Sequence, residues 1–277
     1  MIETPVPLVP ANGALIPQIG LGTWQLSGAT LDAAVDAAVA AGYRHFDTAP
    51  RYENEAGVGA ALRGTGLARD GYFLTTKVWH TELRADAFRA SAERSVEALG
   101  VGPVDLLLIH WPNPEVPLAE TLGALVQARR DGLTRHIGVS NFPARLLDEA
   151  VAIADAPLVA NQCEYHPRLD QSRVIEACRR HGIALVAYAP IGSGRLLEDP
   201  VIAAIAAGHG KSPAQVMLRW HLQQGNVAIP RSSNPSRVAQ NIAITDFTLT
   251  ADEMARLSAL AVPDGRIFNP AHVRSWE

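Results

Sequence analysis

Residues 73–110, FLTTKVWHTELRADAFRASAERSVEALGVGPVDLLLIH, contain the pattern that decides the fold. The segment opens on an apolar run over 73–78, continues with helical periodicity over 85–99, and returns to an apolar run over 104–110. Such apolar runs are typical of strands buried on both faces, and parallel strands need a crossover helix between them. The segment therefore predicts one strand–helix–strand unit of a parallel sheet.

The same alternation continues on both sides of this unit. Further strands are predicted at 19–22, 45–48, 136–140, 159–165, 184–189 and 227–230, and further helices at 30–41, 54–63, 118–130, 144–154, 172–181, 213–223 and 235–242. About eight strand–helix pairs result, the number that closes an α/β fold of the (β/α)8 (TIM) barrel type. A doubly wound open sheet gives a similar alternation, so closure depends on this count. Because no Pro/Ser-rich linker divides the 277 residues, we expect a single domain over 1–277.

Both ends of the chain depart from the alternation. Apolar residues at 6–10 and 14–17 flank the pair Asn12-Gly13, which supplies the positive φ values that a tight hairpin turn requires. We expect an N-terminal β-hairpin that precedes the barrel. The C-terminal tail after Pro263 shows no further repeat, and we expect a loop over the active-site face.

The composition excludes several classes of partner. Hydrophobic residues make up 48% of the chain and charged residues 19%, as in globular proteins with a large core. A formal net charge of −4 gives no basic field for nucleic acid or an anionic membrane, which favours a small-molecule partner. Only Cys163 and Cys178 occur, no apolar run is long enough to span a bilayer, and the first residues lack a signal-peptide pattern. We expect a cytoplasmic monomer with no nucleic-acid or membrane partner.

Polar side chains stand at the ends of three predicted strands. Asp47, Lys77 and His110 each lie at or near such an end. Tyr52 lies in the loop that follows Asp47. In a barrel the loops at the carboxyl ends of the strands build the active site, so we expect these four side chains to converge there.

A phenol, an ammonium, a carboxylate and an imidazole together suit carbonyl reduction. Hydride attack on a carbonyl carbon leaves an alkoxide, which needs a proton donor beside its oxygen. Tyr52 can be that donor, and a nearby Lys77 ammonium would lower the pKa of its phenol from the ordinary value of about 10. Asp47 would hold Lys77 charged and in place, and His110 could bind and orient the carbonyl oxygen.

Each of these residues also has a structural interpretation. Asp47 could cap the following helix or pair with Arg51, and His110 could be a hydrogen-bonded structural residue. Lys77 is harder to explain in this way, because a lysine inside a barrel must find a partner or lose its charge. Together, on successive strand ends, the four residues favour a functional site.

A series of motifs runs in order over nearly the whole chain. The motifs are Gly20-Leu21-Gly22-Thr23-Trp24, residues 42–49 (GYRHFDTA), Tyr52-Glu53-Asn54-Glu55, Thr76-Lys77-Val78-Trp79, residues 105–112 (DLLLIHWP), residues 138–142 (GVSNF), Asn161-Gln162 with Tyr165-His166-Pro167, and Ile229-Pro230-Arg231-Ser232. In this order they resemble the aldo-keto reductase superfamily, and most closely its bacterial 2,5-diketogluconate reductase type.

The resemblance implies a reductase whose catalytic tetrad falls on the same four residues. It also implies a nicotinamide cofactor whose carboxamide is bound by Ser140, Asn141 and Gln162, while Tyr188 stacks on the ring. From the residues alone, Ser140 and Asn141 could equally cap the next helix, and Tyr188 could be a core aromatic residue.

The resemblance further implies NADP(H) as the cofactor. No strand is followed by G-x-G-x-x-G, so a Rossmann-type pyrophosphate site is not available. In similar enzymes the matching segment binds the adenosine end, so Arg231, Ser232 and Arg237 would bind a 2′-phosphate, with Gln240 and Asn241 nearby. Arg231 stands where lysine is usual and Gln240 where glutamate is common, which leaves the strictness of the NADPH preference open. A solvated basic helix start is the structural alternative.

The substrate pocket is expected to be aromatic. Trp24, Trp79 and Trp111 adjoin the tetrad, and the tail at 266–277 would close one side. Apolar walls with few polar groups suit small aldehydes and ketones as substrates. Phe268 and Trp276 in the tail could equally be packing residues.

Two other functions remain open from the sequence. His45 with Asp47 and Glu164 with His166 each lie two apart on a strand, so with His110 they could form the ligand set of a metal-dependent barrel hydrolase. The neighbouring lysine ammonium disfavours binding of a cation, so we expect no metal. A second alternative is a redox-sensing or regulatory protein that keeps the barrel and cofactor without turnover.

Overall fold

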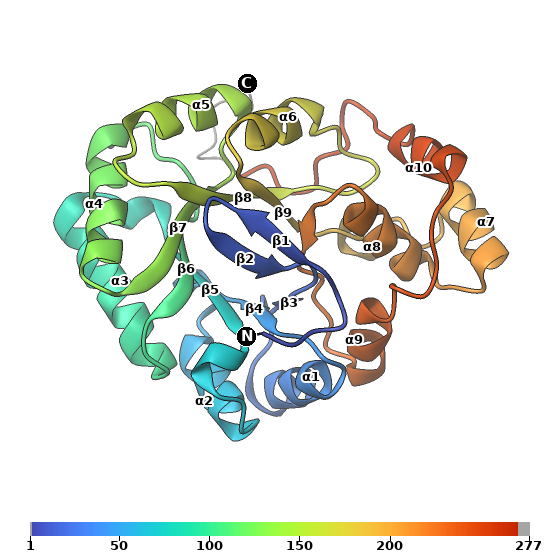
Figure 1. The fold of residues 1–277 in the computed structure, drawn as a ribbon, viewed down its shortest axis with the longest axis horizontal. Helices are drawn as coiled ribbons and strands as arrows, with labels where there is room; N and C mark the ends of the chain where they lie inside the picture. The colour runs from blue at the N-terminus through green and yellow to red at the C-terminus, as the bar shows by residue number, and fades with distance from the viewer. Residues whose placement is uncertain (1, 271–277) are drawn as a thin grey trace.

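An eight-stranded parallel sheet forms the centre of the molecule (Figure 1). The computed structural model describes residues 2–270. The strands follow one another in space in the same order as in the chain, and every pair is parallel. They are β3 (Leu21–Gly22), β4 (His45–Asp47), β5 (Phe73–Val78), β6 (Val104–Ile109), β7 (Thr134–Ser140), β8 (Leu158–Glu164), β9 (Ala184–Tyr188) and β10 (Val227–Ala228).

The sheet curls until its two edges meet. Ile19, just before β3, forms a parallel bridge with Ala228 of β10. Backbone hydrogen bonds of 2.9 Å join Gly20 N–H to Ala228 O and Ala228 N–H to Gln18 O. This contact and the sequential strand order agree with the barrel type that the strand count predicted, and they disagree with an open doubly wound sheet.

Helices surround the curled sheet on its outer face (Figure 1). They are α1 (Gly28–Ala40), α2 (Glu55–Gly64), α3 (Ala85–Leu99), α4 (Leu118–Arg130), α5 (Ala144–Ile153), α6 (Ser172–Arg180), α7 (Pro200–His209), α8 (Pro213–Gln223), α9 (Pro235–Ile242) and α10 (Ala251–Ser258). Close packing explains one glycine: a Cβ on Gly59 of α2 would lie 1.8 Å from Leu99 O at the end of α3. None of the helices in the described part of the chain has the length and apolar character needed to cross a bilayer.

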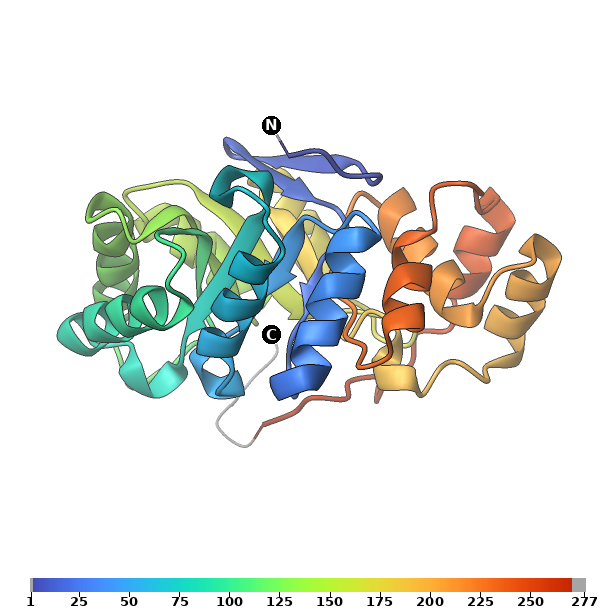
Figure 2. The same ribbon diagram turned by 90° about the horizontal axis from the view of Figure 1, so that it is seen from below.

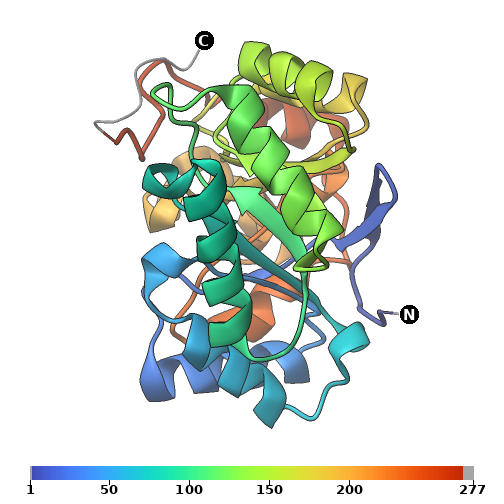
Figure 3. The same cartoon turned by 90° about the vertical axis from the view of Figure 1, so that its left-hand side faces the viewer.

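The hydrophobic core has two layers. The larger lies between the strands and the surrounding helices. The smaller fills the interior of the sheet, where Leu106, Leu108 and Val186 meet Ile16 of the N-terminal hairpin. The hairpin thus seals one end of the strands, and Figures 2 and 3 show it at the end opposite the C-terminal segment.

The hairpin itself was expected at 6–10 and 14–17. Its strands are β1 (Leu8–Ala11) and β2 (Ala14–Pro17), so the first begins later than predicted. Asn12 and Gly13 have φ values of 42° and 93°, as the tight turn required.

Candidate active site

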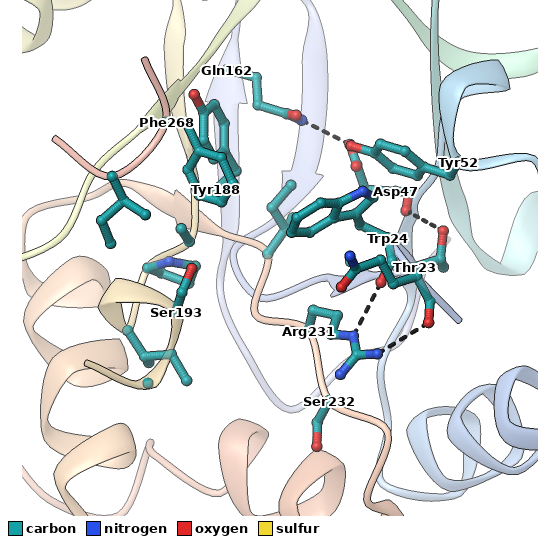
Figure 4. A pocket seen from close by; sticks show the side chains of 18 of the residues that line it. Thr23, Trp24, Asp47, Tyr52, Gln162, Tyr188, Ser193, Arg231, Ser232 and Phe268 are labelled. Carbon is teal, nitrogen blue, oxygen red and sulfur yellow. Dashed lines mark hydrogen bonds between the residues drawn. The ribbon is translucent and has the colours of Figure 1, made fainter. Parts of the chain in front are cut away.

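A cavity of about 1050 Å³ opens at the carboxyl ends of the strands (Figure 4). All of the site residues expected from the sequence line it except Lys77 and Ser140, which lie beneath its surface. Those that line it are Trp24, Asp47, Tyr52, Trp79, His110, Trp111, Asn141, Gln162, Tyr188, Arg231, Ser232, Arg237, Gln240 and Asn241. Strand ends from β3 to β10 therefore contribute to one site.

Lys77 is a buried cation under the floor of this cavity. Its side chain on β5 is fully buried, and Nζ lies 2.6 Å from Asp47 Oδ1 and 2.9 Å from Thr48 O. Nζ also donates to the Tyr52 hydroxyl at 3.4 Å and lies 5.1 Å from the centre of its ring. Neither structural interpretation of Asp47 holds. Asp47 pairs with Lys77 whereas Arg51 pairs with Glu53, and no side chain caps the helices that begin at Pro50 and Glu55.

The pKa values of the two central groups follow from burial and from each other. Burial raises the pKa of Tyr52 above 10, and the Lys77 ammonium opposes that shift without outweighing it. Burial acts to lower the pKa of Lys77, but the Asp47 carboxylate and Tyr52 outweigh it, so the pKa of Lys77 is raised. The expectation that Lys77 lowers the pKa of the phenol is thus correct for the effect of Lys77 itself. The expectation that the pKa of Tyr52 lies below its ordinary value is wrong. At neutral pH the structure holds a neutral phenol beside an ammonium.

His110 is the next residue that packs against Tyr52, after Lys77. Its ring packs edge-on against Tyr52, with ring centres 5.9 Å apart, and against Trp79 at 5.0 Å. His110 directly follows β6, and its backbone N–H donates to Val78 O at the end of β5. This bond holds the backbone from which the imidazole ring extends.

A chain of amides connects this cluster to β7, β8 and β9. Gln162 Nε2 donates to Asp47 Oδ2 at 2.7 Å, so both carboxylate oxygens of Asp47 are used (Figure 4). Asn141 Nδ2 donates to His110 O at 2.9 Å, and the Tyr188 hydroxyl donates to Asn141 Oδ1 at 2.9 Å. Asn141 holds φ at 62°, a left-handed conformation that a non-glycine residue adopts rarely. The side chains expected to meet a carboxamide are therefore gathered on one wall.

The hydroxyl of Ser140 is turned inward. It donates to Gln162 O at 2.7 Å and accepts from Asn141 Nδ2 at 3.0 Å. The alternative that Ser140 or Asn141 caps the next helix is wrong, since Pro143 occupies the position before α5 and no side chain caps it.

The far end of the cavity lies at the start of α9. Asn234 caps this helix by accepting from the N–H groups of Ser236 and Arg237. The guanidinium of Arg231 donates from Nε to Trp24 O at 3.0 Å and from Nη2 to Gln25 O at 3.1 Å (Figure 4). Arg231 thus ties the segment after β10 to the segment after β3.

The described part of the tail forms one wall of the cavity. Phe268 makes edge-on contacts with Trp24 and Tyr188, each with ring centres 5.7 Å apart. Glu164, fully buried at the end of β8, accepts from the N–H groups of Ile267 at 2.6 Å and Phe268 at 2.9 Å. Residues 267–270 line the cavity, whereas Trp276 lies outside the described residues.

Comparison with known proteins identifies the family. The aldo/keto reductase family model matches residues 18–262. The chain belongs to the aldo/keto reductase family. An aldo-keto reductase of Mycolicibacterium smegmatis is 43% identical over 264 residues, which cover 93% of this chain and 96% of the relative.

Solved structures of other aldo/keto reductases have the same fold. One, which carries the name 2,5-diketo-D-gluconic acid reductase B, is 45% identical with a TM-score of 0.94, and the match covers 96% of this chain and 95% of that one. The Bombyx mori aldo-keto reductase in complex with NADP is 34% identical with a TM-score of 0.86, and 94% of each chain is covered. Membership makes this chain an oxidoreductase of a family that uses a nicotinamide cofactor on small carbonyl substrates.

In this aldo/keto reductase the metal-ligand set that the hydrolase alternative required is not assembled. The two ring nitrogens of His45 face Pro17 O and Thr75 Oγ1, each at 3.3 Å. Glu164 is engaged with the tail and with His166 Nε2. No group of three or more His, Cys, Asp or Glu side chains within residues 2–270 is arranged to hold a metal ion.

The cavity wall includes parts that were not expected from the sequence, such as residues 212–214 at the start of α8, and two further parts have unusual features. One is the loop after β9, which contributes Ser193, Gly194 and Leu197. The glycine-rich Gly192-Ser193-Gly194 run was a visible sign of an unusual backbone there, and Ser193 has φ at 52°. The other is Arg51, which was considered only as a partner for Asp47.

Proposed function

We propose that this chain reduces the carbonyl group of small aldehydes and ketones to an alcohol, with NADPH as the hydride donor. The observation that carries the proposal is the contact between Lys77 Nζ and the Tyr52 hydroxyl, at 3.4 Å, in a cavity at the carboxyl ends of the strands. That contact pairs a proton donor with a cation able to stabilise the phenolate it leaves.

The cavity suits a dinucleotide. Its volume of about 1050 Å³ is just above the roughly 300–1,000 Å³ typical of small-molecule sites, and it reaches from Tyr52 to the start of α9. Among the described residues, Asp47 is the only carboxylate that lines it, and Lys77 offsets that charge. When bound there, the reduced nicotinamide would supply a hydride to the carbonyl carbon. Asn141 and Gln162 would bind its carboxamide, and Tyr188 would lie against its ring.

Tyr52 acts as the general acid in this proposal. Its raised pKa keeps the phenol protonated at neutral pH, so the proton is available when the substrate arrives. As hydride attack builds negative charge on the carbonyl oxygen, the proton passes from Tyr52 to that oxygen, because an alkoxide is a stronger base than a phenolate. Lys77, held charged by Asp47, then stabilises the phenolate until solvent returns the proton.

His110 orients the substrate. Its ring packs against Tyr52, so its imidazole can donate a hydrogen bond to the same carbonyl oxygen. Trp24, Trp79 and Trp111 provide the apolar surface against which the rest of a small substrate packs.

The preference for NADPH rests on the far end of the cavity. Arg237 and Ser232 stand beside the start of α9, where the helix dipole also favours an anion. Arg231 donates one hydrogen each from Nε, Nη1 and Nη2 to Trp24, Ser233 and Gln25. A second hydrogen on Nη1 and another on Nη2 could therefore bind a ligand. These groups would bind a 2′-phosphate, while Gln240 and Asn241 would lie against the adenosine.

A direct assay tests the proposal. Purified protein is mixed with NADPH or NADH and a panel of aldehydes and ketones, and cofactor oxidation is followed by absorbance. We expect carbonyl-dependent oxidation of NADPH at a higher kcat/KM than that of NADH. Tight NADPH binding without turnover on any member of the panel would instead support the redox-sensing alternative.

A further inference from the structure

The charges that line the cavity are unevenly distributed for a protein with a net charge of −4. Among the described residues, the cations on its wall are Arg51, Arg231 and Arg237. Two of these, Arg231 and Arg237, stand near the start of α9 and are assigned above to the cofactor phosphate. Arg51 is left without a role in the proposed reaction.

Arg51 stands at the opposite end of the cavity, beside the reacting groups. It immediately precedes Tyr52, and its guanidinium carbon lies 5.7 Å from the centre of the Trp79 ring. The Trp79 ring in turn packs 5.0 Å from the centre of the His110 ring. The Trp79 ring therefore neighbours both the Arg51 guanidinium and the imidazole assigned above to the substrate carbonyl.

The guanidinium is available to a ligand. Within residues 2–270 its ion pair is to Glu53 Oε1, 3.7 Å away and beyond hydrogen-bond distance, and the two side chains are 59% and 82% exposed. An exposed pair of that length contributes little and exchanges readily with another anion. The guanidinium also lies over the Trp79 ring, and a cation–π contact of this kind leaves its N–H groups able to form a bidentate bond with a carboxylate.

We infer that Arg51 is an anion-recognition residue, and that this reductase prefers aldehydes and ketones that carry a carboxylate at a distance from the carbonyl group. The inference rests on the proposed reduction at Tyr52, since it concerns the other end of the same substrate. The carboxylate binds the Arg51 guanidinium, the connecting carbon atoms pack on Trp79, and the carbonyl oxygen reaches Tyr52 and His110.

The test compares an acid with its neutral ester. The probes are 4-carboxybenzaldehyde and methyl 4-formylbenzoate, together with the corresponding 3-substituted pair for a shorter reach. The quantity measured is the ratio of kcat/KM for acid over ester at saturating NADPH, in which effects common to both substrates cancel. We expect a ratio of about ten for at least one pair, falling toward one in Arg51→Ala.

Two further variants test whether a change in the ratio comes from Arg51 itself or from the loss of one positive charge. Glu53→Gln removes the competing carboxylate and should raise the ratio, opposite to Arg51→Ala. Arg84→Ala is the control, because the exposed Arg84 forms an equally long 3.7 Å pair with the half-buried Glu120 and lies outside the cavity wall. It changes the net charge by the same amount as Arg51→Ala and should leave the ratio unchanged. Raising the salt concentration from about 0.02 M to about 0.5 M should lower the ratio in the unaltered protein but not in Arg51→Ala.

The outcomes separate the two proposals. If neither aldehyde is reduced with NADPH, the proposed function fails. If the ester is reduced but the ratio is the same in the unaltered protein, Arg51→Ala and Glu53→Gln, the reduction stands and the role of Arg51 is overturned. An equal fall in Arg51→Ala and Arg84→Ala also overturns it, because net charge alone then explains the effect.

Discussion

At the scale of single residues, the proposed reaction depends on two opposing effects on the pKa of one phenol, that of Tyr52. Burial raises the pKa of Tyr52, and Lys77 partly compensates from 3.4 Å away. The residue types and their positions at strand ends were enough to predict that these groups meet. The sequence could not predict the balance, because the effect of burial on a pKa depends on how the whole cavity closes around the hydroxyl.

Removal of the phenolic hydroxyl should separate binding from chemistry. In Tyr52→Phe we expect kcat for carbonyl reduction to fall by roughly 10²–10⁴-fold, the contribution typical of a positioned general acid. The dissociation constant for NADPH, measured by quenching of protein fluorescence, should stay within about twofold. Near-normal turnover would remove Tyr52 from the role of acid.

A second tyrosine gives the matched control. Tyr43 is fully buried outside the cavity wall and donates its hydroxyl to Val238 O at 3.0 Å. Tyr43→Phe should lower the free energy of unfolding by about 1 kcal/mol, the value of one hydrogen bond, and should leave kcat unchanged.

The cofactor preference can be tested at Arg237. Because this guanidinium stands beside the start of α9, its loss should weaken NADPH binding by about tenfold and NADH binding by less than about twofold. Both dissociation constants are measured by fluorescence titration. Arg256→Ala, on α10 and paired with Asp252, is the control for loss of a positive charge. An equal loss for both cofactors would show that Arg237 does not bind the 2′-phosphate.

At the scale of elements, the bounds predicted for some helices and strands from the spacing of apolar residues agree with the structure. The predicted bounds of β5, α3, α4, α8 and α9 are those observed. Two helices were missed. The sequence PVIAAIAAGH of α7 is apolar over most of its surface and has no distinct apolar stripe to indicate a helix. The sequence of α10 does carry a helix-start signal, a capping box between Thr250 and Glu253.

Long-range contacts set the limit of prediction from the sequence. Glu164 suggested a metal ligand because it lies two residues from His166 on a strand. In the structure its carboxylate instead binds the N–H groups of residues 267 and 268, more than 100 positions away. The sequence around β8 does not indicate this partner. The donors are backbone N–H groups, which nearly every residue has, so the sequence of the tail does not mark them either.

The connection between β8 and the tail should control substrate affinity. In Glu164→Gln the amide keeps one acceptor oxygen but turns an N–H group toward a backbone donor, so the wall formed by Ile267 and Phe268 should loosen. We expect KM for the carbonyl substrate to rise by about tenfold, while the dissociation constant for NADPH changes little. Hydrogen exchange at the amides of residues 267 and 268 should accelerate beyond the change seen elsewhere in the protein.

A buried carboxylate at the other end of the strands provides the comparison for that variant. Asp105 accepts from the Leu74 N–H at 2.8 Å and pairs with Arg69 and Arg135. Asp105→Asn should cost stability without raising KM. If the two variants raise KM equally, general destabilisation explains the effect and the tail contact has no specific role.

At the scale of the whole molecule, buried neutral histidines make stability depend on pH. Burial lowers the pKa of His221 to about 3, and burial also lowers the pKa of His45 and His136. The unfolded chain binds these protons below about pH 6.5, whereas the folded protein binds them only at lower pH. Stability is therefore fully present above pH 6.5 and is lost as the pH falls below it. Glu55, whose pKa burial raises, acts in the opposite direction.

His221 should account for the largest share of this loss. Each pH unit below 6.5 removes up to about 1.4 kcal/mol for one such histidine, so we expect the urea midpoint of unfolding to fall steadily from pH 7 to pH 5. His221→Gln removes the titrating group and should flatten the profile, even if it is less stable at pH 7 through loss of the bond to Pro190 O. His209→Gln, half-buried at the end of α7 and paired with Glu253, is the comparison variant and should keep the slope. A slope that is the same in all three proteins would mean that the acid loss of stability arises from groups other than His221.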